Sequence, residues 1–186
     1  MAIKGATVTL RAPEPKDIPQ LNAWANDADL WQWLIGWHFP YSSQSTEEWV
    51  AKQGDDPSTC VLCIDAPGMG LVGTIGLRNL NWKDGNASVG VMVGDPRARG
   101  KGIGADALQA ISNHAFDELG LHRLDAEILA GNKASLALFK QCGWTVEGVR
   151  REWVRRSGSW HDKVLVGLTV DEYRAFSAAP RRRRKP

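Results

Sequence analysis

Arg97-Ala98-Arg99-Gly100-Lys101-Gly102-Ile103-Gly104 decides the fold, and it lies between a β-rich stretch and a long amphipathic one. Its alternate glycines allow the backbone to approach a ligand closely and to adopt conformations that other residues avoid. The helix expected to begin here supplies unpaired N–H groups and the positive end of its dipole. With the cations Arg97, Arg99 and Lys101 beside them, these groups predict a pyrophosphate site.

Three kinds of loop fit this pattern: an acyl-coenzyme A cradle, a dinucleotide-binding turn, and a glycine-rich loop with solvated cations. Gly100-x-Gly102-x-x-Ala105 fits a permissive dinucleotide fingerprint, and Asp125 follows at about the required 20 residues. However, that fingerprint follows its strand directly, whereas residues 95–99 intervene here and an antiparallel meander replaces the first βαβ unit. A P-loop is excluded because no G-x-x-x-x-G-K-[ST] sequence occurs.

The chain has 186 residues, of which 43% are hydrophobic, and this is enough to bury one sizeable core. We therefore expect one domain over residues 1–176 and a disordered basic tail over 177–186. The last six residues carry five cations, although the formal net charge of the whole chain is only +2. A nucleic-acid-binding role would rest on this tail alone, which argues against it.

No stretch approaches the roughly 20 apolar residues that cross a bilayer, and the N-terminus lacks a signal-peptide core. We therefore expect a cytoplasmic protein with no membrane partner. Cys60, Cys63 and Cys142 are too few for a disulfide framework. The odd spacing of Cys60 and Cys63 in a strand-like run puts them on opposite faces, so no metal site is expected there.

Hydrophobic periodicity and turn residues predict the order of the elements. The expected segments are strand 8–11, helix 16–24, a Trp-rich segment with a further helix, strands 59–65, 71–80 and 87–93, helix 105–119, strand 124–129, helix 132–142, strands 144–154 and 160–169, and helix 171–176. Ser45 and Glu48 have capping-box spacing for the helix after the Trp-rich segment. This order predicts an α+β (mixed α/β) domain around one mostly antiparallel sheet.

The strand at 87–93 followed by Arg99-x-x-Gly102-x-Gly104 resembles the acyl-CoA signature of the GNAT superfamily of N-acetyltransferases. Asn132-x-x-Ser135, with Phe139 to Trp144 and Glu147-Gly148 after it, is similar to the branch that contains ribosomal-protein N-terminal acetyltransferases and spermidine acetyltransferases. The resemblance covers roughly residues 7–173. It implies a sheet splayed between the strands at 87–93 and 124–129, with acetyl-CoA as the cosubstrate and no metal.

The resemblance also implies which residues hold the coenzyme. Loop amides and cations would bind its pyrophosphate, the end of the 87–93 strand would line the pantetheine, and the following helix would contact the pantetheine or sulfur. The implied set is Met92, Val93, Arg99, Gly100, Lys101, Gly102, Ile103, Gly104, Asn132, Ser135 and Phe139. Asn132 and Ser135 also suit a helix start, where capping alone would explain them.

Two positions depart from the family pattern. Phe139 stands where many relatives have the Tyr that meets the thiolate, and it cannot donate a proton, so Ser135 is the nearest replacement. Ser88 stands where relatives often carry a Glu, which leaves the base open. The candidates are Glu127, Glu152, His161 and Asp162, and an amine can also lose its proton to solvent.

The acceptor pocket is expected between the Trp-rich segment and the last hairpin, because aromatic faces hold cations well. Core packing is the alternative for at least half of these aromatic residues. The pocket candidates are Trp31, Trp33, Trp37, His38, Phe39, Tyr41 and Asp162.

The expected activity is acetyl transfer from acetyl-CoA to a primary amine, by direct attack in a ternary complex. A small-molecule acceptor is favoured, such as an amino sugar, an antibiotic or an amino-acid derivative. The alternatives are a peptide N-terminus, such as that of a ribosomal protein, and a non-catalytic acyl-CoA-binding module. Relatives often pair through the terminal hairpin, so a homodimer is expected.

Overall fold

The computed structural model describes residues 2–36 and 39–179. Its strands are β1 (Ile3–Lys4), β2 (Thr9–Arg11), β3 (Cys60–Ala66), β4 (Gly70–Asn81), β5 (Asn86–Val93), β6 (Arg123–Leu129), β7 (Thr145–Arg156) and β8 (Ser159–Thr169). Its helices are α1 (Ile18–Ala25), α2 (Ala28–Trp31), α3 (Ser43–Ala51), α4 (Ile103–Asn113), α5 (Lys133–Gln141) and α6 (Val170–Ala178), with short helical turns η1 (Pro15–Asp17), η2 (Pro96–Ala98) and η3 (His114–Glu118).

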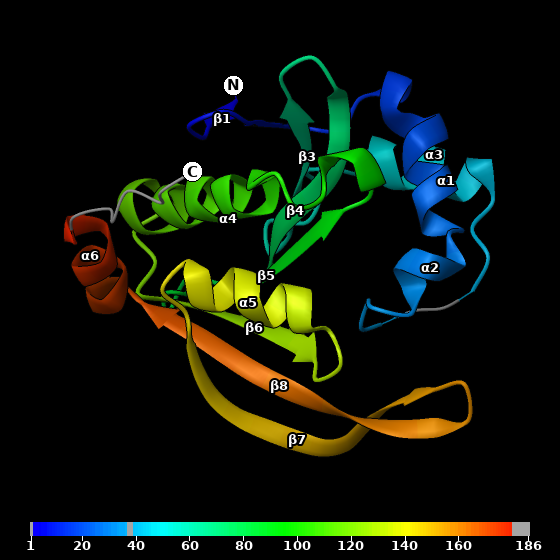
Figure 1. Ribbon diagram of the computed structural model, residues 1–186. Coiled ribbons are helices and arrows are strands. Elements are labelled where there is room, and N and C mark those ends of the chain that lie inside the picture. The colour runs from blue at the N-terminus through cyan, green and yellow to red at the C-terminus, as the bar shows by residue number, and fades with distance from the viewer. Residues whose placement is uncertain (1, 37–38, 180–186) are drawn as a thin grey trace.

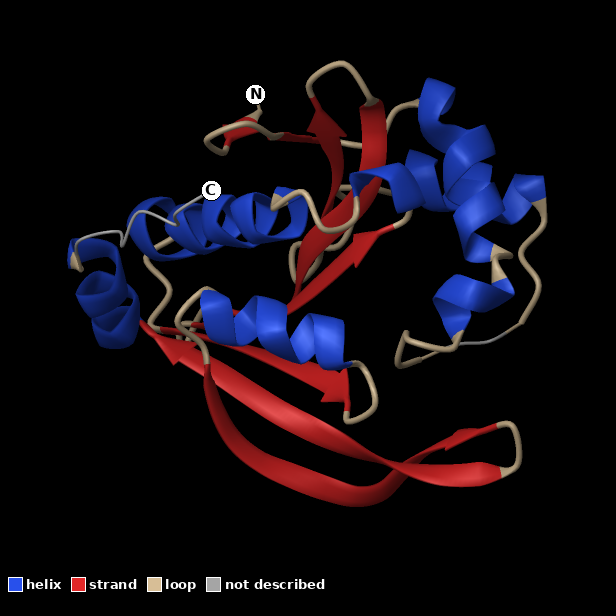
Figure 2. Cartoon of the chain, viewed as in Figure 1, coloured by secondary structure: helices blue, strands red, loops and turns tan. Residues whose placement is uncertain are grey.

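All eight strands form one sheet in the order β1-β2-β3-β4-β5-β6-β8-β7. Every neighbouring pair is antiparallel except β5 and β6, which run parallel. The main hydrophobic core joins the sheet to α4 and α5, whereas a smaller cluster, which includes Trp24 and Cys63, lies under α1 to α3. The predicted α+β domain around a mostly antiparallel sheet is confirmed (Figures 1 and 2).

The sheet splays open at its parallel pair. β5 and β6 pair only from Asn86 with Arg123 to Ser88 with Asp125. Beyond Ser88 the two strands diverge, so that β5 continues toward η2 and β6 continues beneath α5 (Figure 1). The expected splay between the strands at 87–93 and 124–129 is therefore present.

The structure corrects three local predictions. The helix after the Trp-rich segment begins at Ser43, and its N-cap is Ser42, whose hydroxyl accepts from the Ser45 amide at 3.0 Å; the capping box at Ser45 and Glu48 is therefore wrong. The single helix predicted over 105–119 begins at Ile103, and its last turn is π-helical. β1 was not predicted, because two residues are too few for a periodic pattern.

The described residues contain no helix that is long and apolar enough to cross a membrane. They also contain no group of three or more His, Cys, Asp or Glu side chains placed to hold a metal ion. Helix α6 runs to Ala178, past the expected domain boundary at 176. The basic tail at 181–185 lies outside the described residues, so its disorder stays a prediction.

Asp106 in α4 links the segment between β1 and β2 to the helix that follows the glycine loop. Its carboxylate accepts the backbone amides of Ala6, Thr7 and Val8 at 2.7–2.9 Å, and the Thr7 hydroxyl at 2.8 Å. Burial raises the pKa of the Asp106 carboxyl, but these donated hydrogen bonds outweigh it and hold the pKa below its ordinary value. The negative charge is therefore part of the folded structure.

We expect Asp106→Asn to lower the free energy of unfolding by about 2 kcal/mol at pH 7, because it removes a charged acceptor from several donors. Since the folded-state pKa is lowered, this contribution is complete above the unfolded-state value of about 3.9 and is lost as pH falls through the folded-state pKa. Urea unfolding between pH 7 and pH 2.5 measures both effects. Glu118→Gln, at an exposed carboxylate, is the control and should change neither.

Candidate functional site

The glycine loop exposes backbone amides at the start of α4. Gly100 and Gly102 have φ values of +73° and +79°, which L side chains rarely adopt, and Gly102 is the N-cap of the helix. The backbone amide of Asp106 donates to the Gly102 carbonyl, so the amides of the three preceding residues, 103–105, come before the first intrahelical hydrogen bond. A Cβ built at Gly100 or Gly102 would meet no atom within 4 Å. The loop is therefore an open cradle of N–H groups.

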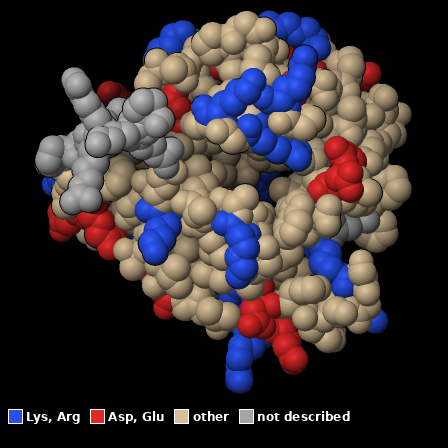
Figure 3. Space-filling view, viewed as in Figure 1, with Lys and Arg blue, Asp and Glu red and all other residues tan. Residues whose placement is uncertain are grey.

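The three cations of the loop have different surroundings. Arg97 pairs with Asp95 at 2.7 Å and holds the pKa of that carboxyl below its ordinary value. Arg99 donates to the carbonyl oxygens of Val93 and Gly94 at 3.2 Å, which ties the loop to the end of β5. Lys101 is exposed. Lys and Arg side chains gather over this loop, beside a hollow in the surface above α5 (Figure 3).

A cavity of about 440 Å³ occupies the splay between β5 and β6. Asn132, Ser135 and Phe139 of α5 line it from the face of the sheet that carries α4 and α5. On the opposite face it is lined by Trp33, Leu34 and Ile35, which follow α2. Its lining therefore includes residues from both faces of the sheet.

Alternate residues of β4 and β5 form one wall of the cavity. The paired positions are Thr74 with Met92, Gly76 with Gly90, and Arg78 with Ser88, all on the same face of the sheet. A Cβ at Gly90 would meet no atom within 4 Å, whereas a Cβ at Gly76 would lie 2.4 Å from the Cys60 carbonyl oxygen of β3. Gly90 therefore leaves its strand backbone open to the cavity, and Gly76 allows β3 to approach closely.

The α5 wall combines a capped helix start with a buried ring. The Asn132 side chain accepts from the Ser135 amide at 3.0 Å, so Asn132 is the N-cap. The Ser135 hydroxyl makes no hydrogen bond to any residue that the structure describes, and Ser135 lines the cavity. Phe139 is buried, and its ring meets that of Trp144 edge to face at 4.8 Å. Asn132 therefore caps the helix, whereas the Ser135 hydroxyl has no hydrogen-bond partner among the described residues.

Glu127 of β6 is the only carboxylate among the described residues that line the cavity. One carboxylate oxygen accepts from Lys163 at 2.6 Å and the other from Arg150 at 3.3 Å. Lys163 is buried, and its ammonium lies 4.7 Å from the centre of the Trp153 ring. Glu127 is thus paired with two cations, one on each carboxylate oxygen.

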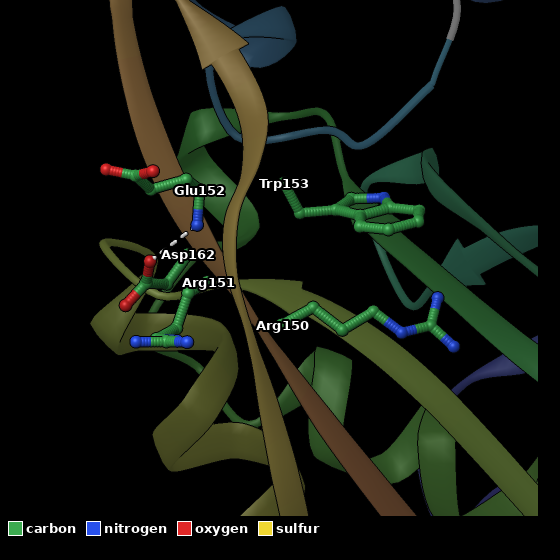
Figure 4. Close-up of a pocket in the computed structure, with 5 residues that line it drawn as sticks. All are labelled: Arg150, Arg151, Glu152, Trp153 and Asp162. Carbon is green, nitrogen blue, oxygen red and sulfur yellow. Dashed lines mark hydrogen bonds between the residues drawn. The ribbon is translucent and has the colours of Figure 1, made fainter.

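Several predicted site residues lie away from this cavity. Glu152 and Asp162 line a separate open groove at a bulge in β7, where Asp162 accepts the Glu152 amide at 2.9 Å (Figure 4). The Glu152 carboxylate points away from Trp153 in that view. His161 pairs with Val154 in the terminal hairpin.

The aromatic residues predicted for the acceptor pocket also differ in whether they line the cavity. Trp33 lines the cavity, whereas Trp31 is half-buried in α2 and Tyr41 is partly exposed and anchored through its backbone to Asn26. Trp37 and His38 lie outside the described residues, and Phe39 is exposed.

Sequence reasoning missed Arg78 as a cavity residue. The sequence carries no motif around it, and only the register with Ser88 brings it to the cavity. The structure does mark this position with a backbone irregularity. The next residue, Asn79, has a φ of +52° at a register shift of β4. Such bulges often re-aim a side chain near a functional site.

The cysteines are not placed for nucleophilic catalysis. All three are free, and none lines the cavity. Burial raises the pKa of the Cys63 thiol to about 12 and that of Cys142 to about 11, and it also raises the pKa of Cys60. The reactive thiolate form is therefore scarce at neutral pH.

Comparison with known proteins places these features in a family. The chain is 25% identical over 169 residues to the uncharacterized N-acetyltransferase YokL of Bacillus subtilis, covering 91% of this chain and 93% of that protein. It is 27% identical over 171 residues to an L-methionine sulfoximine/L-methionine sulfone acetyltransferase of Pseudomonas aeruginosa, covering 91% and 98% of the two chains.

Solved structures share the fold. A spermidine N-acetyltransferase from Vibrio cholerae, in complex with CoA and spermine, superimposes with a TM-score of 0.82 at 22% identity, covering 90% of this chain and 98% of that one. RimL, a ribosomal L7/L12 α-N-protein acetyltransferase in complex with CoA, also gives 0.82 at 22% identity, covering 92% and 99%.

The family model for the acetyltransferase (GNAT) domain matches residues 7–145, which include the glycine loop, the splayed strands and α5. These are the elements that build the cradle and the cavity. The chain therefore belongs to the GNAT family of acetyltransferases, and its acetyl donor is acetyl-CoA.

Proposed function

We propose that this chain transfers the acetyl group of acetyl-CoA to the primary amine of a small molecule, by direct attack within a ternary complex. The observation that carries the proposal is the cavity through the splayed sheet, which joins the α5 side to the Trp33 side. Two reactants can meet there from opposite faces of the sheet. Holding them in this way makes the reaction effectively unimolecular.

The residues of the cradle fit a coenzyme with a pyrophosphate. The amides at 103–105 and the open backbone at Gly100 and Gly102 suit phosphate oxygens, and Lys101 and the remaining donors of Arg99 add positive charge. Beyond Ser88, the edge of β5 has no pairing with β6, so its backbone groups at Met92 and Val93 are suited to a pantetheine arm. Bound acetyl-CoA would supply an acetyl group activated as a thioester.

In this proposal the protein contributes positioning and hydrogen bonds. Backbone N–H groups near the end of β5 polarise the acetyl carbonyl, and the free Ser135 hydroxyl donates to the departing sulfur. Phe139 packs against Trp144 and keeps water from that side. The acceptor amine enters neutral and attacks the acetyl carbonyl, and the positively charged nitrogen that results passes one proton to water.

We also propose that the protein is cytoplasmic and pairs with a second copy along β7. Three free cysteines suit a reducing compartment. β7 is the last strand in the sheet order, and its exposed Val146 and Val149 offer apolar surface to a partner strand.

The proposed activity is tested with a panel of primary amines and N-terminal peptides, with acetyl-CoA present and release of the free thiol measured. At 100 times its Kd, acetyl-CoA should raise the free energy of unfolding by about 2.7 kcal/mol. Gly102→Asp should abolish this stabilisation, because it adds a side chain and a negative charge to the cradle. Coenzyme binding without turnover of any amine would show a binding module instead of an enzyme.

The matched control for Gly102→Asp is Gly158→Asp in the hairpin turn. Gly158 has a φ of +82° and open space around its Cβ position, so the backbone strain is comparable. Gly158→Asp should keep full coenzyme binding. Equal loss of coenzyme binding in both variants would show that the coenzyme does not bind at the glycine loop.

Gly90→Val should leave the melting temperature unchanged and reduce acetyl transfer at least about 100-fold, because its side chain projects into open space at the wall of the cavity. Steady-state kinetics and thermal unfolding measure the two effects. Gly148→Val in β7 is the control, since it also adds a side chain at a strand position with open space. Normal turnover by Gly90→Val would contradict the proposed path through the splay.

Ser135→Ala should lower kcat about 100-fold and change the Kd of acetyl-CoA little, because the lost hydroxyl acts on the departing sulfur. The Asn132 cap stays intact, since it is made to the backbone amide at position 135. Equal losses in kcat and in coenzyme affinity would assign Ser135 to binding alone. Pre-steady-state kinetics with direct coenzyme titration separates these outcomes.

A further inference from the structure

The charged side chains that line the acceptor side of the cavity differ in whether they have a partner in the protein. Among the described residues that line it, the charged side chains are Arg78 and Glu127. Glu127 is held by Lys163 and Arg150, one on each carboxylate oxygen. Arg78 is exposed, and it makes no hydrogen bond or ion pair with any residue in 2–36 and 39–179. The charge without a protein partner at the rim of the cavity is therefore positive.

The position of Arg78 is set by the backbone. Arg78 lies opposite Ser88 in the β4–β5 pairing, and the register shifts directly after it. At that shift Asn79 has a φ of +52°, a left-handed conformation that costs free energy for a residue with a side chain. The bulge ends the regular pairing of β4 at Arg78 and places this side chain at the rim of the cavity.

Arg78 lies on the face of the sheet that also carries Met92, near the place proposed for acetyl transfer at the end of β5. Gly76 and Gly90 occupy the next register level, about 7 Å along the strand, and Thr74 and Met92 occupy the level after it. The long Arg78 side chain together with a small zwitterion spans this separation. The apolar side chains of Trp33, Leu34 and Ile35 complete the surroundings.

We propose that the acceptor carries an anionic group close to its primary amine, and that Arg78 binds this group. The inference rests on the proposed acetyl transfer and names the substrate class of the same cavity. A guanidinium presents donors in a fork that matches the two oxygens of a carboxylate, and it also binds phosphate. The free α-amino acids are the simplest acceptors of this kind, with the side chain placed against the apolar residues at 33–35.

The same charges disfavour a polyamine acceptor. A polyamine carries several positive charges and needs unpaired carboxylates. The described lining offers one carboxylate, Glu127, and two cations already occupy it. Arg78 would in addition repel a cationic chain.

The test compares acceptors in matched sets that differ only in the anionic group. Leucine, leucinamide and 3-methylbutylamine form one set, and phenylalanine, phenylalaninamide and 2-phenylethylamine form another. Glucosamine 6-phosphate and glucosamine test whether a phosphate serves in place of a carboxylate. Spermidine and N-terminal peptides complete the panel. In at least one set, kcat/KM should be 10-fold or more higher for the anionic member than for its neutral partners.

Arg78→Gln should then raise KM for the anionic acceptor about 10- to 100-fold, with little change in kcat, because a charged hydrogen bond to the substrate is lost. KM for the neutral partner should stay within about twofold. Arg78→Lys should restore part of the affinity, since it keeps the charge but not the fork. Arg174→Gln, at an exposed position in α6, is the control and should change neither constant.

The inference is overturned if the neutral members are used as well as the anionic ones, or if Arg78→Gln changes both classes equally. Turnover of spermidine or of peptides, with no anionic amine accepted, overturns the inference and leaves acetyl transfer standing. Coenzyme binding with no turnover of any amine overturns both the inference and the proposed transfer.

Discussion

The short parallel pairing of β5 with β6 is the constraint on which the rest of the site depends. Pairing stops at Ser88 and Asp125, so the remaining backbone of β5 lacks a neighbouring strand on that side. Buried backbone groups without partners cost free energy, and a ligand that runs along the strand can supply them. Beside the gap lies α5, whose Phe139 packs in the main core against Trp144. One interruption of the sheet thus creates both the groove proposed for the coenzyme and the passage proposed for the acceptor.

The electrostatics of the site follow from that geometry. On the α4 side, backbone amides at a helix start and two loop cations make an anion site. On the opposite face, a network from three strands neutralises the one carboxylate, since β7 and β8 contribute Arg150 and Lys163 to Glu127 of β6. Arg78 then remains as the charge without a protein partner in the described lining. Both ends of the proposed passage therefore favour negative groups, and between them Gly90 leaves open space at the wall of the cavity.

Local sequence signals predicted most of the elements. Asp84-Gly85 was identified as the turn between two strands, and Gly85 has the expected positive φ of +64°. Ser157 and Gly158 turn the last hairpin in the same way. The capping error arose because two serines three residues apart, Ser42 and Ser45, offer the same chemistry, and only Ser42 is the cap. A cap is chosen by where the chain enters the helix, and tertiary packing sets that point.

The sequence by itself determined the sheet-and-helix order, the glycine cradle and the family, because turns, caps and glycine conformations depend on neighbours along the chain. It also brought Asn132, Ser135 and Phe139 into consideration, since they share one helix. Only the tertiary structure showed that Glu152 and Asp162 line a groove separate from the cavity. It also paired Glu127 with cations of two other strands and brought Arg78 to the cavity rim. Those outcomes depend on strand register and on bulges, which place residues far apart in the sequence side by side.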